Sequence, residues 1–433
     1  MADVSGCAPL NFEKIWAMFQ EPDRVIKKTD KMGKKVSIFK FRRFFFLFHV
    51  FGALWFTACA VPTDNRPNSG NQNVITYESR IFNVQRLNVD TEEWYTLSAS
   101  KLAEGAYCII YVSDTELVPV SLAKFIASEY DANIYDAMTG VFGDYMAKGF
   151  DVDANGKTIL LLLDIMDGYV GSGGFVAGFF DPVHMYDTST YAHSNYADML
   201  FIDINPQSPR SMGFYVTLAH ELQHLINFAM HNGFPQETWL NEGLSSAAEY
   251  LYGGHQWSRI NYFNADPLGT IAQGNNFFVW DGHWEDDGDS LANYATAYLF
   301  FQWLRIQSRD PSIYRAIAAS EFRDYRAVTQ AAKDRIGIGN GTGSTDDEKI
   351  WGGLLSSWMI ANYQNDPFSL YGYRGEWKAT NLKKHNIASP TTPVKLSPGE
   401  GVFSEKKQNS SRFTGQNHIH YKEIEITSAI PGP

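Results

Sequence analysis

Four residues in the middle of the chain have the types and spacing of a catalytic metal site. His220 and His224 are four positions apart, Glu221 follows the first of them, and seventeen residues separate the second from Glu242. On a helix, the two imidazoles would project from one face, one turn apart, and could bind a single ion. A catalytic zinc site has three protein ligands and keeps a fourth position for water. His220, His224 and Glu242 would fill the three, and Glu221 would lie beside the water as a proton acceptor.

Two helices are expected to position these side chains. Residues 214–230 form an apolar run with a helical pattern, residues 232–235 break it, and a second helical pattern carries Glu242 near its start. His231 lies on the helical face of His220, but eleven residues separate them by about 16 Å along an unbroken helix, too far for one ion. Because the HExxH spacing also arises by chance, a surface helix with two solvated histidines is the alternative interpretation.

The pattern of elements predicts an α+β fold. Short strand-like runs occupy about 76–115, a helical pattern covers 121–150, and continuous apolar strands are expected at 158–165 and 199–204. Strands that precede the motif helix favour a sheet with this helix packed on it, up to about residue 235. A mainly helical part should follow over about 236–370. Residues 371–433 show short strands and loops, which predict a small β-rich appendage.

The motif residues together resemble the gluzincin zinc peptidases, and most closely the hyicolysin family within that group. The similar stretches are 219–228, 239–252 and 358–363. The resemblance covers about residues 100–370. It implies a two-lobed peptidase unit, expected over 76–370, with an N-terminal mixed sheet and one catalytic zinc ion. It implies that His220, His224 and Glu242 bind the zinc, and that Glu221 is the general base.

The resemblance also suggests residues around the metal. The run that begins at Tyr294 is similar to the helix of zinc aminopeptidases that carries the oxyanion-stabilising tyrosine, although the expected Lys-Gly pair is replaced by Thr296 and Ala297. Tyr298, His283 and Tyr262 are the other candidates, and a core tyrosine is the alternative. Asn241 fits the Asn-Glu pattern of the group. Ser246 stands where many members have an acid that orients a zinc histidine, so Ser246 or Glu249 is expected to take that place.

Two glycine-containing segments allow more than one interpretation. Residues 171–178 are glycine-rich, and Gly174, Phe175, Val176 and Ala177 could form a substrate rim that pairs with an extended peptide. An ordinary hairpin is the alternative.

The segment from Asp151 to Gly156 has the spacing of the start of a calcium-binding EF-hand loop. The position that should hold a bidentate glutamate is Leu162, inside a predicted strand. A simple turn is therefore the favoured interpretation.

The N-terminal segment has the character of an export signal. A basic lead at 34–43 precedes an apolar run, and small residues then lead to Cys59, which resembles the lipidated cysteine of bacterial lipoproteins. Residues 1–58 would be the signal, with Met32 as a possible true start, and 59–75 a flexible tether. A single transmembrane anchor at 44–61 is the alternative. We therefore expect the protein in the bacterial cell envelope, attached to the membrane through lipid on Cys59.

The distribution of charge along the chain indicates which kinds of partner the protein can bind. The chain carries a net charge of −12, and residues 1–58 hold ten basic and five acidic side chains, so the remaining chain carries −17. Such an acidic body argues against nucleic acid as a partner, because phosphate binding needs basic patches. The predicted function is zinc endopeptidase activity on proteins or peptides. A non-catalytic surface adhesin with a structural zinc, and a zinc aminopeptidase, are the alternatives.

Overall fold

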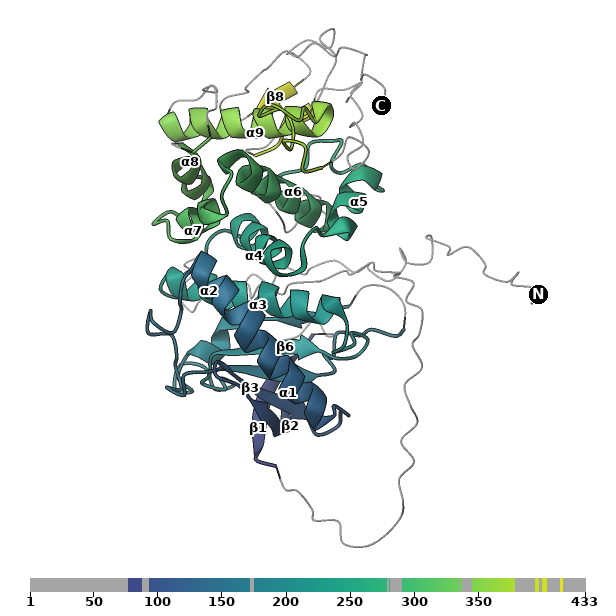
Figure 1. Ribbon diagram of the computed structural model, residues 1–433, viewed down its shortest axis with the longest axis vertical. Helices are drawn as coiled ribbons and strands as arrows, with labels where there is room; N and C mark the ends of the chain where they lie inside the picture. The colour runs from purple at the N-terminus through teal and green to yellow at the C-terminus, as the bar shows by residue number, and fades with distance from the viewer. Residues whose placement is uncertain are drawn as a thin grey trace, which may run out of the picture.

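The protein has a sheet lobe and a helical lobe. The computed structural model describes residues 77–87, 93–171, 175–278, 280, 290–333, 335–336, 345–377, 394–396, 399–402 and 413–415 (Figure 1). In Figure 1 the sheet lies below helix α3, and the helical lobe is stacked above α4. This arrangement confirms the predicted α+β class.

The sheet lobe is built on six strands in the order β1-β2-β3-β4-β6-β5. β3, β4 and β6 run parallel to one another, whereas β1, β2 and the edge strand β5 pair antiparallel with their neighbours. The bounds are β1 (Ser79–Arg86), β2 (Glu93–Glu104), β3 (Cys108–Ser113), β4 (Thr158–Leu163), β5 (Gly178–Phe179) and β6 (Met199–Asp203). The sheet is therefore mixed, as the resemblance implied.

Alternate residues of the central strands enter two different cores. Leu160 and Leu162 of β4 face the helices, whereas Ile159 and Leu161 belong to the smaller core on the opposite side of the sheet. A strand that is buried on both faces needs an unbroken apolar run, which is what β4 supplies. The face toward the helices is covered by α1 (Val120–Glu129), the π-helix η3 (Tyr130–Tyr135), α2 (Asp136–Phe142) and α3 (Met212–Met230).

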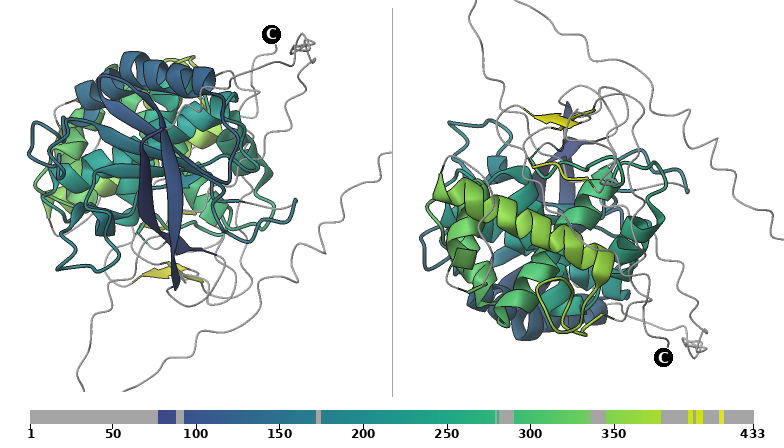
Figure 2. Two further views of the ribbon diagram at one scale, coloured as in Figure 1. Left: turned by 90° about the horizontal axis from the view of Figure 1, so that it is seen from below. Right: turned by 90° about the horizontal axis from the view of Figure 1, so that it is seen from above.

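The helical lobe consists of stacked helices that continue the same core. Its bounds are α4 (Thr238–Gly253), α5 (Trp257–Ala265), α6 (Ser290–Ser308), α7 (Ser312–Ala318), α8 (Tyr325–Lys333) and α9 (Asp346–Gln364). Seen from above, α9 crosses the other helices of this lobe (Figure 2). α4 and α6 approach closely because a Cβ at Gly243 would overlap the Phe301 ring. This glycine lies directly after Glu242, so it helps to bring the metal motif against α6.

The helical lobe extends beyond the predicted boundary at residue 370. Tyr373 and Trp377 are buried in its core, 0% and 2% exposed. Past this point the structure describes a parallel pair of short strands, β7 (Val394–Leu396) and β8 (Phe413–Gly415). The export signal, the tether and Cys59 lie outside the described residues. Among the helices that are described, none has both the length and the apolar character needed to span a membrane.

Candidate metal centre

The motif residues lie on two consecutive helices that pack against each other. The Ser211 hydroxyl begins α3 by accepting a hydrogen bond from the Phe214 N–H at 3.3 Å. α3 ends at Met230, and the chain reverses through Asn232 and Gly233, whose φ angles of 53° and 85° lie in the left-handed region. α4 then returns alongside α3. Because the helices face each other, residues separated by a short connection can meet at one point.

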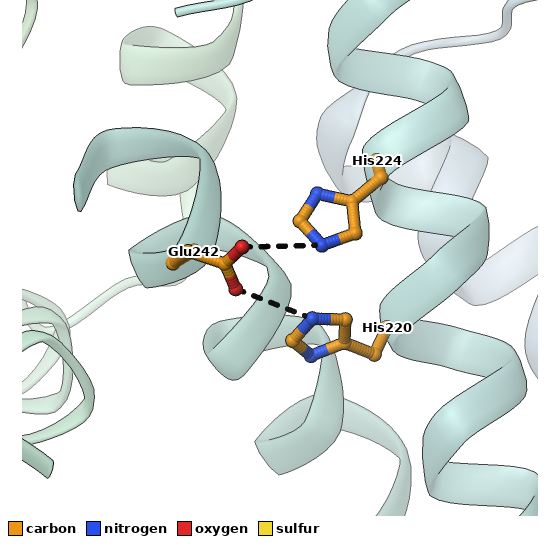
Figure 3. A group of neighbouring side chains, drawn as sticks. All are labelled: His220, His224 and Glu242. Carbon is orange, nitrogen blue, oxygen red and sulfur yellow. Dashed lines mark ion pairs between the residues drawn. The ribbon is translucent and has the colours of Figure 1, made fainter. Parts of the chain in front are cut away.

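His220, His224 and Glu242 meet where the two helices touch (Figure 3). Nε2 of His220 lies 3.4 Å from Oε2 of Glu242, and Nε2 of His224 lies 3.7 Å from Oε1 of the same carboxylate. All three side chains are at most 1% exposed. Ligand atoms about 2 Å from a tetrahedral zinc ion lie roughly 3.3 Å apart, so this separation suits a zinc ion. The donor set of two imidazoles and one carboxylate also matches zinc chemistry.

The outer nitrogen of each histidine is held by a side chain of α4. Nδ1 of His220 lies 2.8 Å from Oε1 of Glu249, and Nδ1 of His224 lies 3.0 Å from Oγ of Ser245. The Ser245 hydroxyl donates its proton to Gln223, so its oxygen accepts the Nδ1 proton of His224. Both rings are thereby fixed in the tautomer that turns an Nε2 lone pair toward Glu242. Such support orients a metal ligand and raises its basicity.

Arg259 of α5 connects this support to Tyr294. The side chain is buried, and its Nη2 lies 3.3 Å from Oε1 of Glu249. The guanidinium carbon lies 4.6 Å from the centre of the Tyr294 ring, in a cation–π contact. One cation therefore touches both the carboxylate behind His220 and the tyrosine beside the metal ligands.

Burial sets the protonation states of the centre. It lowers the pKa of His220 and of His224 well below the usual value, so that both imidazoles are neutral, the form that binds a metal. Burial also raises the pKa of Glu242 and of Glu221 well above the usual range. For Glu221 the backbone amide of Phe180 opposes this shift. A buried carboxyl group with a raised pKa is suited to accepting and then returning a proton.

Glu221 faces the edge strand β5. A Cβ at Gly178 would lie 3.2 Å from Cγ of Glu221, 2.8 Å from Cγ2 of Thr217 and 3.0 Å from the Phe201 carbonyl oxygen. Glycine at this position therefore allows the strand to approach α3 closely. The side chain of Glu221 packs against the position that a side chain at residue 178 would occupy.

Tyr294 lies in the first turns of α6, beside Glu242. Burial, followed by the charge of Glu242, raises the pKa of its hydroxyl well above the usual value, and the ring packs on Trp280. The hydroxyl lowers the pKa of Glu242 by hydrogen bonding. Of the other candidates, Tyr298 accepts the Gln256 N–H at 2.9 Å, and His283 lies outside the described residues.

The expected supporting residues differ in their placement. Glu249 contacts His220 as described, and Asn241 lies close enough to His224 to raise its pKa. The Ser246 hydroxyl is buried and has no hydrogen-bond partner in the part of the chain that the structure describes. The hydroxyl on the histidine belongs instead to Ser245, which was not predicted. Positions three and four residues after Glu242 share one helical face, and only the rotation of α4 decides between them.

The expected substrate rim is only partly described. Gly174 lies outside the described residues, Phe175 is partly exposed, and Val176 and Ala177 are buried. The Val176 N–H donates to Asp167 at 2.6 Å, and the Ala177 carbonyl accepts the Asp203 N–H at 2.9 Å. These two backbone groups are therefore already bound within the protein.

Comparison with known proteins gives one informative relationship. No family model matches the chain. The sequence is 28% identical over 336 residues to a protein named neutral metalloprotease ShpI from Staphylococcus hyicus, an alignment that covers 74% of this chain and 70% of that protein. The aligned length exceeds the motif region many times over, so the similarity is not confined to a short chance match. The chain is therefore related to the hyicolysin-like zinc metallopeptidases.

Proposed function

We propose that this protein is an exported zinc endopeptidase in which His220, His224 and Glu242 hold the ion. The observation that carries the proposal is the convergence of these three donors, with both Nδ1 atoms held from behind by Glu249 and Ser245. The similarity to a neutral metalloprotease supports the same reading. Zinc bound at this position polarises the scissile carbonyl and lowers the pKa of a bound water.

The chain's own residues then carry out the proton transfers. The Glu221 carboxylate accepts a proton from the attacking water and gives it to the nitrogen of the departing amine, so one water is added as one peptide bond breaks. The burial that raises the pKa of Glu221 makes its carboxylate a stronger acceptor of the water proton. Tyr294 donates a hydrogen bond to the oxyanion that develops on the carbonyl, a role that its place beside Glu242 supports.

Endopeptidase activity is favoured over aminopeptidase activity by the sequence. The chain lacks the Gly-x-Met-x-Asn segment with which zinc aminopeptidases hold a substrate amino terminus. Peptides with a blocked amino terminus distinguish the two activities. We expect blocked peptides to be cleaved, and cleavage restricted to free amino termini would favour the aminopeptidase.

Export and lipid attachment rest on the N-terminal sequence. We propose that Cys59 carries the lipid, so that Cys59→Ala moves the protein from the membrane fraction to a soluble fraction of the producing cells. Retention of the variant in the membrane fraction would favour the transmembrane anchor.

The decisive experiment measures casein degradation by the purified protein and by Glu221→Gln at matched zinc content. Glu221→Gln should keep its zinc and lose turnover by about three orders of magnitude or more, because base and nucleophile act together. Glu321→Gln changes an exposed glutamate and serves as the control. Turnover retained in Glu221→Gln would refute this mechanism. Inactivity of both proteins with zinc bound would favour the adhesin.

A further inference from the structure

A second group of acidic side chains converges far from the metal motif in the sequence. Asp151 and Asp153 belong to the turn before β4, whereas Asp198 comes directly before β6. One carboxylate oxygen from each lies within 4.8 Å of those of the other two. β4 and β6 are neighbouring parallel strands, and the Asp198 carbonyl accepts the Ile159 N–H at 2.9 Å. The sheet itself therefore brings Asp198 against the turn.

The burial and the hydrogen bonding of Asp198 distinguish this group from an exposed acidic turn. Its side chain is fully buried, 0% exposed. Oδ2 accepts a hydrogen bond from the Tyr145 hydroxyl at 2.8 Å, and Tyr145 is held in turn by Thr158. Oδ1 is buried without a hydrogen-bond partner among the described residues. A buried carboxylate oxygen without a partner is costly, and a bound cation removes that cost.

The nearby basic side chains are directed to other groups. Burial raises the pKa of Asp153, and the charge of Arg80 only opposes that shift, because its Nη2 donates to the Asn195 carbonyl at 2.7 Å. The Lys157 amino group bonds Glu104 and the Gly105 carbonyl. Within the described ranges, no lysine or arginine forms an ion pair with any of the three aspartates. Three carboxylates thus converge without a direct counter-charge.

We propose that Asp151, Asp153 and Asp198 bind a divalent cation, with Ca²⁺ preferred, that fastens the turn before β4 to the start of β6. Oxygen donors alone select a hard cation such as Ca²⁺ rather than zinc. Calcium–oxygen bonds of about 2.4 Å allow ligand oxygens to be up to about 4.8 Å apart, which accommodates every pair here, whereas Mg²⁺ needs shorter and more regular bonds.

The turn has the shape of the first half of a calcium loop. Asp151 accepts the N–H groups of Asn155 and Gly156 at 3.1 and 3.0 Å, and Gly156 has a φ of 70°. A simple turn accounts for these bonds, but not for the buried oxygen of Asp198. In an EF-hand loop the last ligand would be a bidentate glutamate, and the corresponding position here is Leu162, which is buried in β4. The structure supplies the further carboxylate from a neighbouring strand instead.

The test uses the full chain loaded with one equivalent of zinc, so that the peptidase centre stays filled. Tb³⁺ emission excited through tyrosine, with Ca²⁺ as competitor, reports binding beside Tyr145, and the melting temperature reports its effect on stability. Asp198→Asn is the main variant, because the amide resembles the neutral acid in shape. Asp187→Asn changes an exposed aspartate and is the control.

We expect Ca²⁺ to displace Tb³⁺ and to raise the melting temperature of the wild type and of Asp187→Asn. Asp198→Asn should bind Ca²⁺ at least about tenfold more weakly, because calcium affinity follows the number of charged ligands. Asp153→Asn, in the partly exposed turn, should show the same loss and replaces Asp198→Asn if that variant does not fold. A wild type that does not respond to Ca²⁺, or variants that respond as the wild type does, would overturn the proposal.

Discussion

Oε1 of Glu249 lies 2.8 Å from Nδ1 of His220, so a carboxylate from one helix fixes the ring of a proposed metal ligand on the other. The same oxygen lies 3.3 Å from Nη2 of the buried Arg259. Glu249 is seven residues after Glu242, two turns along α4. The helix that provides the third ligand therefore also orients the first.

Replacing Glu249 should weaken metal binding without removing a ligand. Glu249→Gln keeps the shape but loses the charge that holds the Nδ1 proton of His220, and we expect zinc affinity to fall by about 10- to 100-fold. Competition with a chromophoric chelator measures the affinity, and Glu321→Gln is the control. Unchanged affinity would mean that the contact does not support the metal.

Arg259 should act on stability and on turnover together. Arg259→Met leaves Glu249 as a buried carboxylate without its cation, and breaking such a pair costs about 3–5 kcal/mol. Arg259→Lys keeps a charge but loses the planar group that packs on Tyr294, so we expect it to restore stability more than kcat. Urea unfolding and casein turnover separate the two effects. Equal recovery of both in the lysine variant would argue against a role of the ring contact.

Gly178 offers a test that leaves the metal ligands untouched. Gly178→Ala places a methyl group 2.8 Å from Cγ2 of Thr217 and 3.2 Å from Cγ of Glu221, so Thr217 must shift and the Glu221 side chain is pressed. We expect kcat to fall by about tenfold or more, with zinc content unchanged, since small displacements of a catalytic group are costly. Gly140→Ala is the matched control, because its methyl group meets nothing within 4 Å and favours α2. Equal activity of the two variants would contradict the prediction.

Tyr294→Phe separates two roles of one hydroxyl. If it stabilises the oxyanion, kcat should fall by about 10²- to 10³-fold while zinc affinity stays near that of the wild type. If it serves only to hold Glu242, zinc affinity should fall instead. Metal titration and kcat, measured on the same preparation, decide between them.

Asp198 should make stability depend on pH when Ca²⁺ is absent. Burial raises the pKa of its carboxyl group from 3.8 to about 8, with the charges of Asp153 and Asp151 adding to the shift and the hydrogen bonds from the Tyr145 hydroxyl and the Asp198 backbone opposing it. Between these values the native protein keeps a proton that the unfolded chain has released, so stability falls as pH rises from about 4 to 8.

Added Ca²⁺ should reduce this dependence, because the ion stabilises the ionised carboxylate. The comparison of wild type with Asp198→Asn isolates the contribution, since Asp203, whose pKa is also raised to about 8, remains in both. Urea unfolding at pH 5 and pH 8 measures it. Parallel pH profiles for the two proteins would contradict the prediction.

The sequence predicted best those features that depend on the repeat of a single helix or strand. The four-residue spacing of His220 and His224 places them on one helical face whatever surrounds them, and the apolar run of β4 marks a strand buried on both sides. Contacts between segments that are far apart in the sequence could not be predicted from it. Arg259 reaches the centre from a third helix, and Asp198 reaches the turn through strand pairing. Even on α4, the choice of Ser245 over Ser246 depends on how the helix is rotated against α3.

The separation of the ligands along the chain has a topological consequence. An ion held by His224 and Glu242 would close a ring of chain that runs through the connection between α3 and α4, much as a disulfide does. Closing a ring restricts the unfolded chain more than the folded one. Resistance of the 231–237 connection to an added protease would therefore report how much of the protein carries its ion, without any measurement of catalysis.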